Sequence, residues 1–360
     1  MVKNFLFSLI IFTSFALADL IKPNNNAALR TIHILFEWEQ EPNAQAYNLR
    51  VFNSNDNVIL DIMEESTVYI DTNNFDWDND YSWQVRVVYG TQSFSEWSQR
   101  QFFSTTSSTL TNLNINEYNP NLVENGIMIY SQFLPYFAVG AIDNDGNEVW
   151  NTQTGYMNHV SEFGEIYGVL NDKGVKYNFN HDILWQSPDN SYAIDSHEVK
   201  QIPNGNYMAF ATIFQNGPIP IGAWTNYFQV LGYIADGVTQ EIPWLGLRIV
   251  EFDKDTGEEV WSWNPFEHFS MDDSDLHGGN WWGAAFNGFF DWMHTNAFHF
   301  DEEEGVIYVS HRHLSRISKI AYPSGEVIWN MGLPAEYNTG DDNICTELLF
   351  SFQHHIQLMD

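Results

Sequence analysis

The sequence contains little cysteine and little positive charge. Its 360 residues include one cysteine, Cys345, and 14 Lys and Arg residues against 47 Asp and Glu residues. A single cysteine excludes an internal disulfide, so the fold depends on its core and its hydrogen bonds. The formal net charge of −33 argues against a nucleic-acid partner and against anionic membrane surfaces, because both attract basic patches.

Long apolar runs are missing as well, except at the start of the chain. Lys3 precedes an apolar run over residues 5–17, and an Ala-x-Ala cleavage site ends at Ala18. This order predicts a secretory signal peptide over residues 1–18, cleaved after Ala18. The run is too short for a membrane-spanning helix, and no later segment reaches that length. We therefore expect a secreted protein, periplasmic or extracellular, with no membrane span.

The remaining composition favours β-structure. Aromatic residues make up 16% of the chain, and short apolar runs are separated by Gly, Asn and Asp. Aromatic residues are common in strands, and the small polar residues are common in turns. A length of 360 residues exceeds what one core usually serves. We predict an all-β protein with two domains.

Residues 19–106 carry the pattern of a small β-sandwich. Short runs of alternating apolar and polar residues follow one another between turns, and the Ser/Thr-rich stretch 104–109 marks the boundary after them. Without a cysteine pair, this region resembles a fibronectin type III domain, a module that usually spaces or binds. The expected core residues are Trp38, Tyr47, Leu49, Val51, Tyr81, Trp83, Val85 and Val87.

One pattern repeats through residues 110–360. A strand, a tight turn and a second strand that carries a tryptophan recur at Trp150, Trp185, Trp261 and Trp329. The intervals are 35, 76 and 68 residues, near one or two units of a four-stranded propeller blade. The repeat predicts a β-propeller. The longer intervals contain insertions at about 214–246 and 265–290, which are expected to form loops on one face of it.

Three histidines occupy one phase of this repeat. His197, His294 and His354 each directly precede the first strand expected in a blade. The first strands of a propeller surround its channel, so we expect these side chains to converge although they are distant in sequence. Asn296 and Arg312 belong to the same strand–turn–strand unit as His294.

These residue types suit the transfer of a small oxyanion. The Arg312 guanidinium can bind two oxygens at once, and Asn296 adds neutral donors. A histidine can attack as a nucleophile or donate a proton to a leaving oxygen. The competing interpretation of a histidine cluster is a metal site, but no ligand set here has the short spacing of known zinc motifs. We predict no metal and no cofactor.

Two motifs carry a resemblance to a known family. Asp291-Trp292-x-His294-x-Asn296 is followed by Ser310-x-Arg312 and then by the run from Gly325 to Gly332. Together they resemble the arylsulfotransferases, specifically over residues 291–332 and more weakly over the rest of 110–360. The resemblance implies a secreted six-bladed propeller that moves a sulfuryl group between phenols without the nucleotide donor PAPS. It implies an aryl sulfate donor and a phenolic acceptor as small-molecule partners.

The resemblance also implies roles for the site residues. His354, in the element Gln353-His354, corresponds to the histidine that becomes sulfated. Arg312 and Asn296 would hold the sulfuryl oxygens, and His294 and His197 would bind oxygens or shuttle the proton. The aryl ring needs an aromatic partner, for which the candidates are Trp292, Trp281 and Trp282.

The sequence departs from the family pattern at three places. Ser196 stands where a further histidine is frequent, and His355 follows His354 where aspartate is commoner, so the nucleophile is either His354 or His355. The sequence also ends inside the expected first strand of a fifth blade, after about four blades. We expect a fragment or an incomplete ring. The alternatives to a transferase are a non-catalytic adhesion or glycan-binding propeller and an aryl sulfate hydrolase.

Overall fold

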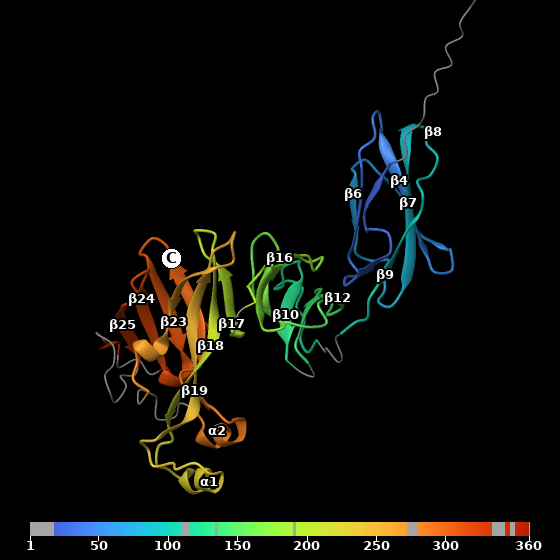
Figure 1. The fold of residues 1–360 in the computed structure, drawn as a ribbon. Coiled ribbons are helices and arrows are strands. Elements are labelled where there is room, and N and C mark those ends of the chain that lie inside the picture. The colour runs from blue at the N-terminus through green and yellow to red at the C-terminus, as the bar shows by residue number, and fades with distance from the viewer. Residues whose placement is uncertain are drawn as a thin grey trace, which may run out of the picture. The chain divides into compact units, whose positions relative to one another are not determined.

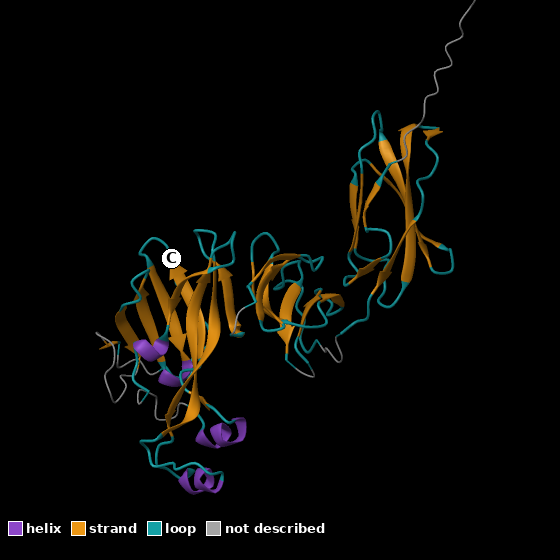
Figure 2. Cartoon of the chain, in the orientation of Figure 1, coloured by secondary structure: helices purple, strands orange, loops and turns teal. Residues whose placement is uncertain are grey.

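The computed structural model describes residues 18–109, 115–133, 136–189, 192–271, 279–332, 343–345 and 350–359. Apart from Ala18, the predicted signal peptide lies outside these residues. Strands form nearly all of the regular structure, and the helices are short (Figure 2), so the all-β class is confirmed. The described part contains no helix that is both long and apolar enough to cross a membrane. The chain folds as two compact units, residues 1–153 and 154–360.

The first unit begins with two sheets that enclose one core. The smaller sheet has the order β1-β3-β6 and the larger has the order β2-β9-β7-β4-β5, with β8 paired to β7. The strands are β1 (Leu20–Lys22), β2 (Ala27–Leu29), β3 (Ile34–Trp38), β4 (Ala46–Asn53), β5 (Val58–Glu64), β6 (Val68–Asp71), β7 (Asp80–Gly90), β8 (Ser93–Phe94) and β9 (Gln101–Thr105).

The sequence pattern accounts for this core. Side chains alternate between the two faces of a strand, so every second residue of β3 is buried. All eight core residues that the alternation predicts are buried, with Trp38 and Trp83 among the largest. Trp83 meets Phe36 edge to face across the core, with ring centroids 5.2 Å apart. The resemblance of this sandwich to one particular domain family stays a prediction.

A third sheet belongs to the same unit. It consists of β10 (Met128–Gln132), β11 (Ala138–Ile142) and β12 (Glu148–Asn151). The Ile32 amide donates to the Val149 carbonyl at 3.0 Å, and the Glu148 carboxylate accepts from the hydroxyl of Thr109 at 2.6 Å. These bonds tie the sheet to the sandwich, so the first unit extends past the polar stretch 104–109 and includes it.

The second unit consists of three sheets in which each strand pairs with the next (Figure 1). These pairs are antiparallel, apart from one parallel pair at the end of the third sheet. The first contains β13 (Tyr156–Val160), β14 (Ile166–Leu170), β15 (Lys173–Tyr177) and β16 (Ile183–Gln186). The second contains β17 (Ile194–Gln201), β18 (Tyr207–Pro218), β19 (Gln240–Phe252) and β20 (Glu259–Trp263). The third contains β22 (Thr295–Asp301), β23 (Val306–His311), β24 (Arg316–Ala321), β25 (Val327–Gly332) and β26 (Asn343–Ile344).

The first strands of these sheets are neighbours in space. β17 contacts β13 on one side and β22 on the other. Propeller blades place their first strands side by side in this manner. Side chains at the start of β17 and of β22 are thereby brought close together. The six-bladed ring itself stays a prediction.

The tryptophan repeat has the same local structure each time. The four tryptophans, Trp150, Trp185, Trp261 and Trp329, lie on β12, β16, β20 and β25, opposite Ala141, Lys176, Glu251 and Lys319. In all four hairpins the pairing register shifts directly beside that pair. The predicted strand–turn–strand design is therefore present in each.

The two predicted insertions extend the second sheet. Strands β18 and β19 run beyond it and end in α1 (Thr225–Val230), while α2 (Trp281–Asn287) and β21 (Phe290–Asp291) follow β20, with β21 parallel to β19 (Figure 1). Several of their aromatic side chains pack on one another and are buried, whereas others, such as Phe286, are exposed. The Trp281 ring stacks on Phe290 with centroids 4.0 Å apart. This packing fixes the direction in which the chain enters residues 291–294.

Candidate active site

Irregular backbone places the first two histidines. In β17, Ile194 pairs with Ala211 and Val199 with Ala209, so the residues between them bulge out of the pairing, His197 among them. His294 directly precedes β22 and has a φ of +46°. Bulges and left-handed residues re-aim side chains away from the regular alternation. The two imidazoles consequently meet, with ring centroids 5.2 Å apart.

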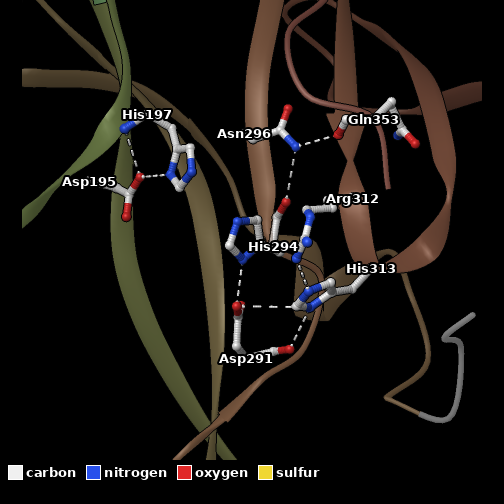
Figure 3. Close-up of polar contacts among 8 residues, drawn as sticks. All are labelled: Asp195, His197, Asp291, His294, Asn296, Arg312, His313 and Gln353. Carbon is white, nitrogen blue, oxygen red and sulfur yellow. Dashed lines mark hydrogen bonds and ion pairs between the residues drawn. The ribbon is translucent and has the colours of Figure 1, made fainter. Parts of the chain in front are cut away.

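The third histidine is held by side chains and not by strand pairing. Residues 351–359 contain no strand, although the sequence predicts one there. Asn296 braces the main chain on both sides of His354: its Nδ2 donates to the Gln353 carbonyl at 2.8 Å, and its Oδ1 accepts from the His355 amide at 3.2 Å. The first of these bonds is drawn in Figure 3.

The side chain of Gln353 attaches the same segment to the third sheet. Its Nε2 donates to the carbonyls of His311 at 3.2 Å and of Arg316 at 2.9 Å, at the turn between β23 and β24. The element Gln353-His354 is thus fixed to the third sheet by two amide side chains. This explains how His354 reaches the site without belonging to a strand.

The structure brings His354, and not His355, to the other two histidines. The His354 ring lies 5.5 Å from that of His294 and 6.2 Å from that of His197, centroid to centroid. One ring nitrogen from each of the three lies within 4.8 Å of the others. His355 is exposed and offers its backbone amide to Asn296. The geometry therefore favours His354 of the two candidates.

Two of the histidines are paired with carboxylates (Figure 3). Nδ1 of His197 lies 2.6 Å from Oδ1 of Asp195, and Nδ1 of His294 lies 2.5 Å from Oδ2 of Asp291. Burial disfavours the charged form of His197, but the bond to Asp195 and the nearby carboxylates outweigh it and raise its pKa. The pKa of Asp291 is lowered because His294 stabilises its charge against the cost of burial.

The pKa of His354 is shifted in the opposite direction to that of His197. Partial loss of solvent around its ring and the positive charges on His294, Arg312 and His197 lower its pKa below the ordinary histidine value. His354 is therefore neutral over a pH range in which His197 retains its proton. A neutral nucleophile and a proton donor can coexist in this cluster.

Arg312 is positioned by the histidine that follows it. Its Nη1 donates to Nε2 of His313 at 2.7 Å, while Nδ1 of His313 donates to the Asp291 carbonyl at 2.9 Å. Both residues belong to the short helix η2 (Arg312–Leu314) after β23. Burial lowers the pKa of His313, which keeps the ring neutral and able to accept from Arg312. The guanidinium is thus held beside His294.

The expected role of Asn296 changes with the structure. Asn296 is 4% exposed, and its amide is occupied by the main chain around His354. It positions the candidate nucleophile, where the sequence suggested that it would bind oxygens of the substrate. His197, His294, His354 and Arg312 converge as expected.

The expected stacking of Trp292 and Trp281 on a substrate does not fit their positions. Trp292 is fully buried against Phe266, with ring centroids 4.9 Å apart, and Trp281 is 9% exposed in the aromatic packing around α2. Both are core residues, because their ring faces are covered by other rings. Trp282, by contrast, is 52% exposed.

The site contains three residues for which the sequence analysis predicts no role. Asp195 and Asp291 hold His197 and His294, and His313 holds Arg312. The Asp-x-His and Asp-x-x-His spacings were visible signals, since each puts a carboxylate near an imidazole in a tight bend. The role of His313 depends on the turn of η2 and left no sequence signal.

Comparison with known proteins supports the family resemblance. Residues 239–351 match the model of the arylsulfotransferase (ASST) family, a stretch that holds His294, Asn296 and Arg312. The predicted resemblance is confirmed for this part of the chain. The match ends before His354 and does not include His197. No curated protein matches the chain.

Among solved structures, the crystal structure of an exotype rhamnogalacturonan lyase matches with 12% identity and a TM-score of 0.22. The match covers 86% of this chain and 52% of that one, so the chain spans about half the length of that structure. A likeness this weak carries no argument about fold or function.

Proposed function

We propose that the protein is an aryl-sulfate sulfotransferase that moves a sulfuryl group from an aryl sulfate to a phenol through a sulfohistidine at His354. The observation that carries the proposal is the placement of His354 beside the carboxylate-paired His197 and His294, next to Arg312. The match of residues 239–351 to the arylsulfotransferase family supports the reaction class.

In the first half-reaction the neutral ring of His354 attacks the sulfur of the aryl sulfate. A nitrogen–sulfur bond forms while the bond between sulfur and the aryl oxygen breaks, and its electron pair stays on that oxygen. The departing aryloxide takes a proton from the imidazolium of His197, since the Asp195 carboxylate raises the pKa of this ring and favours its protonated form. A free phenol and a sulfohistidine result.

In the second half-reaction an acceptor phenol attacks the same sulfur. The now neutral His197 takes the proton of the acceptor hydroxyl, and the nitrogen–sulfur bond breaks with its electron pair returning to His354. The site is then restored and no external co-reactant is consumed. Splitting the transfer into two displacements at one histidine is the usual gain of nucleophilic catalysis.

Arg312 supplies positive charge at the site of an otherwise strongly acidic protein. The chain has a formal net charge of −33, which opposes the approach of an aryl sulfate anion. Among the described residues, the side chain of Arg312 is hydrogen-bonded only through Nη1, to His313. Its Nη2 keeps donors for sulfuryl oxygens, and it stabilises the charge that they carry during transfer.

The expected setting of the reaction is outside the cytoplasm. The signal peptide predicted over residues 1–18 would export the chain, and the partners would be two small molecules, an aryl sulfate and a phenol. Export stays a prediction, and the N-terminal sequence of the mature protein would test it. Cleavage after Ala18 is the expected result.

The experiment uses a chromogenic aryl sulfate with and without a phenolic acceptor. A transferase releases the chromogenic phenol at a rate that depends on the acceptor, forms the acceptor sulfate and shows ping-pong kinetics. Release with water alone at the same rate would make the protein a hydrolase. No release at all, in a folded protein, would favour the non-catalytic binding alternative and contradict the proposal.

A further inference from the structure

The three histidines of the site also form a set of possible metal ligands. His197, His294 and His354 come from β17, from the residue before β22 and from the segment at 350–359. One ring nitrogen from each histidine lies within 4.8 Å of the corresponding nitrogens of the other two. Neutral imidazole nitrogens are good ligands for zinc and related divalent ions. The repeat predicts that the three histidines converge although they lie 97 and 60 residues apart, but their spacing matches no short zinc motif.

The carboxylates that are hydrogen-bonded to two of these rings favour metal binding as well. Nδ1 of His197 is bonded to Asp195 and Nδ1 of His294 to Asp291, which leaves Nε2 of each ring as the nitrogen available to a ligand. Metal-binding histidines usually donate their second nitrogen to a carboxylate, which fixes the ring and makes it a stronger ligand. Two of the three rings here already have that support.

We propose that His197, His294 and His354 bind one divalent transition-metal ion of the zinc class, and that the bound ion excludes sulfuryl transfer. A tetrahedral zinc site with nitrogens at about 2.0 to 2.1 Å from the metal needs nitrogens about 3.4 Å apart. The side chain of His354 is exposed, and rotation of its ring closes the remaining distance. Three histidines leave a fourth position for water.

The charges around the set favour a cation. With neutral imidazoles, Asp195 and Asp291 contribute two negative charges against one positive charge on Arg312. The rest of the chain adds a strongly negative background, at −33 overall. A dication is therefore attracted to the same place where an aryl sulfate must overcome repulsion.

A second set, Asp291, His294 and His313, is also close enough to hold an ion. It is the weaker choice because both ring nitrogens of His313 are engaged, one with Arg312 and one with the Asp291 carbonyl. An ion there would have to break both bonds and lie directly beside the guanidinium. The two sets share His294, so only variants of the other members tell them apart.

The exclusion of transfer rests on the proposed function, whereas binding of the metal does not. A metal ion on His354 occupies the lone pair that would attack sulfur. Bound zinc is therefore expected to abolish acceptor-dependent transfer, and a chelator to restore it. Full activity of the zinc-loaded protein would overturn the exclusion. A protein that shows no transfer even when metal-free, but that binds zinc, would contradict the proposed function and leave the metal site standing.

The binding test uses the full chain with any affinity tag removed, in a Cys345→Ser background, since Cys345 is an exposed thiol that can itself bind zinc. Zn²⁺ is titrated calorimetrically, and Co²⁺ is followed by its visible absorption. One equivalent per chain is expected. His354→Ala and His197→Ala should each lose stoichiometric binding, and Asp195→Asn should weaken it by about 10- to 100-fold.

Two control variants make the result decisive. His299→Gln replaces a histidine on β22 that lies outside both sets, and should bind like the parent. His313→Ala should also retain one equivalent. Loss of binding in His313→Ala with retention in His354→Ala would place the ion on the second set and overturn the assignment. The assignment would also be overturned if no variant changed the binding of zinc, or if the parent protein bound no zinc at all.

Discussion

The sandwich of the first unit and the histidine cluster of the second unit are built on opposite principles. In the sandwich, β4 and β7 pair without any shift of register from Ala46 to Asn53. Their inward side chains are apolar and buried. In the second unit, β17 and β22 both lose register where the candidate site residues lie. Regular pairing thus builds a core, and interrupted pairing turns polar side chains toward one another.

The difference has an energetic side. The sandwich gains stability from burying large aromatic groups, whereas the cluster gathers charged groups whose burial is costly and must be offset by partners. Asp195, Asp291 and His313 are those partners. Substitutions in the first region should therefore change stability, and substitutions in the second should change activity or its dependence on pH.

The largest effect is expected for His354→Ala. Removing the nucleophile should reduce transfer by about 10⁴-fold or more, because the two-step route is lost. The unfolding temperature should change little, since His354 is exposed. Turnover assays with aryl sulfate and phenol, beside thermal unfolding, measure both. His355→Ala is the matched control and should keep near-parental activity. If His355→Ala were inactive and His354→Ala active, His355 would be the nucleophile.

Trp83→Ala should have the next largest effect, on stability. Trp83 is fully buried and meets Phe36 in the sandwich core, so its loss should cost about 3 to 5 kcal/mol. Urea unfolding followed by fluorescence would show an earlier transition for the first unit. Trp83→Phe is the matched control: it keeps a ring and removes a buried Nε1 that has no partner among the described residues, so it should cost much less.

Activity below the unfolding transition should survive Trp83→Ala, because the histidine cluster lies in the other unit. A loss of transfer in folded Trp83→Ala protein would show that the two regions are not independent in function. That result would contradict the assignment of stability to the sandwich and of activity to the histidine cluster.

Asn296→Ala should have an intermediate effect on activity. It removes the bonds to the main chain on both sides of His354 and leaves those groups unpaired, at about 1 to 3 kcal/mol. Transfer should fall by roughly 10- to 100-fold through misplacement of the nucleophile. Asn296→Asp keeps the acceptor for the His355 amide but sets a buried carboxylate oxygen against the Gln353 carbonyl, so it should not recover the lost activity. A change confined to KM would instead assign Asn296 to substrate binding.

The smallest effect is expected for Asp195→Asn, on the pH profile. Transfer requires neutral His354, so it falls as the pH drops through the lowered pKa of that residue. It also requires protonated His197, so it falls as the pH rises through the raised pKa of that residue. The profile is bell-shaped, and loss of the Asp195 charge should move its alkaline limb to lower pH.

The pH profile is measured as kcat/KM for the parent and for two variants. Asp189→Asn is the control, since Asp189 pairs with Lys173 at the surface and should leave the profile unchanged. An unmoved alkaline limb in Asp195→Asn would mean that His197 is not the acid that the reaction needs.

Much of the fold and part of the site could be predicted from the sequence. Alternation revealed the core of the sandwich, because one buried face imposes a period of two on Trp83, Val85 and Val87. The repeat revealed the tryptophan hairpins and the convergence of His197, His294 and His354. These features depend on periodicity, which a sequence displays directly.

The other features of the site depend on local backbone geometry, which the periodicity of a sequence does not encode. The bulge around His197, the left-handed backbone at His294 and the turn at His313 decide which nitrogen faces which partner. The motif predicts that Trp292 faces a ligand, yet Phe266 after β20 and Trp244 in β19 cover its ring. A pattern of residue types does not say which face of a ring is covered.

The central claim is that His354 carries the sulfuryl group between donor and acceptor. The most direct test is mass spectrometry of the protein after brief exposure to an aryl sulfate without acceptor, with peptide mapping under conditions that preserve the nitrogen–sulfur bond. The account predicts one added sulfuryl group on the peptide containing His354, lost on addition of a phenol and absent in His354→Ala. A sulfuryl group on another residue, or transfer without any labelled protein, would contradict it.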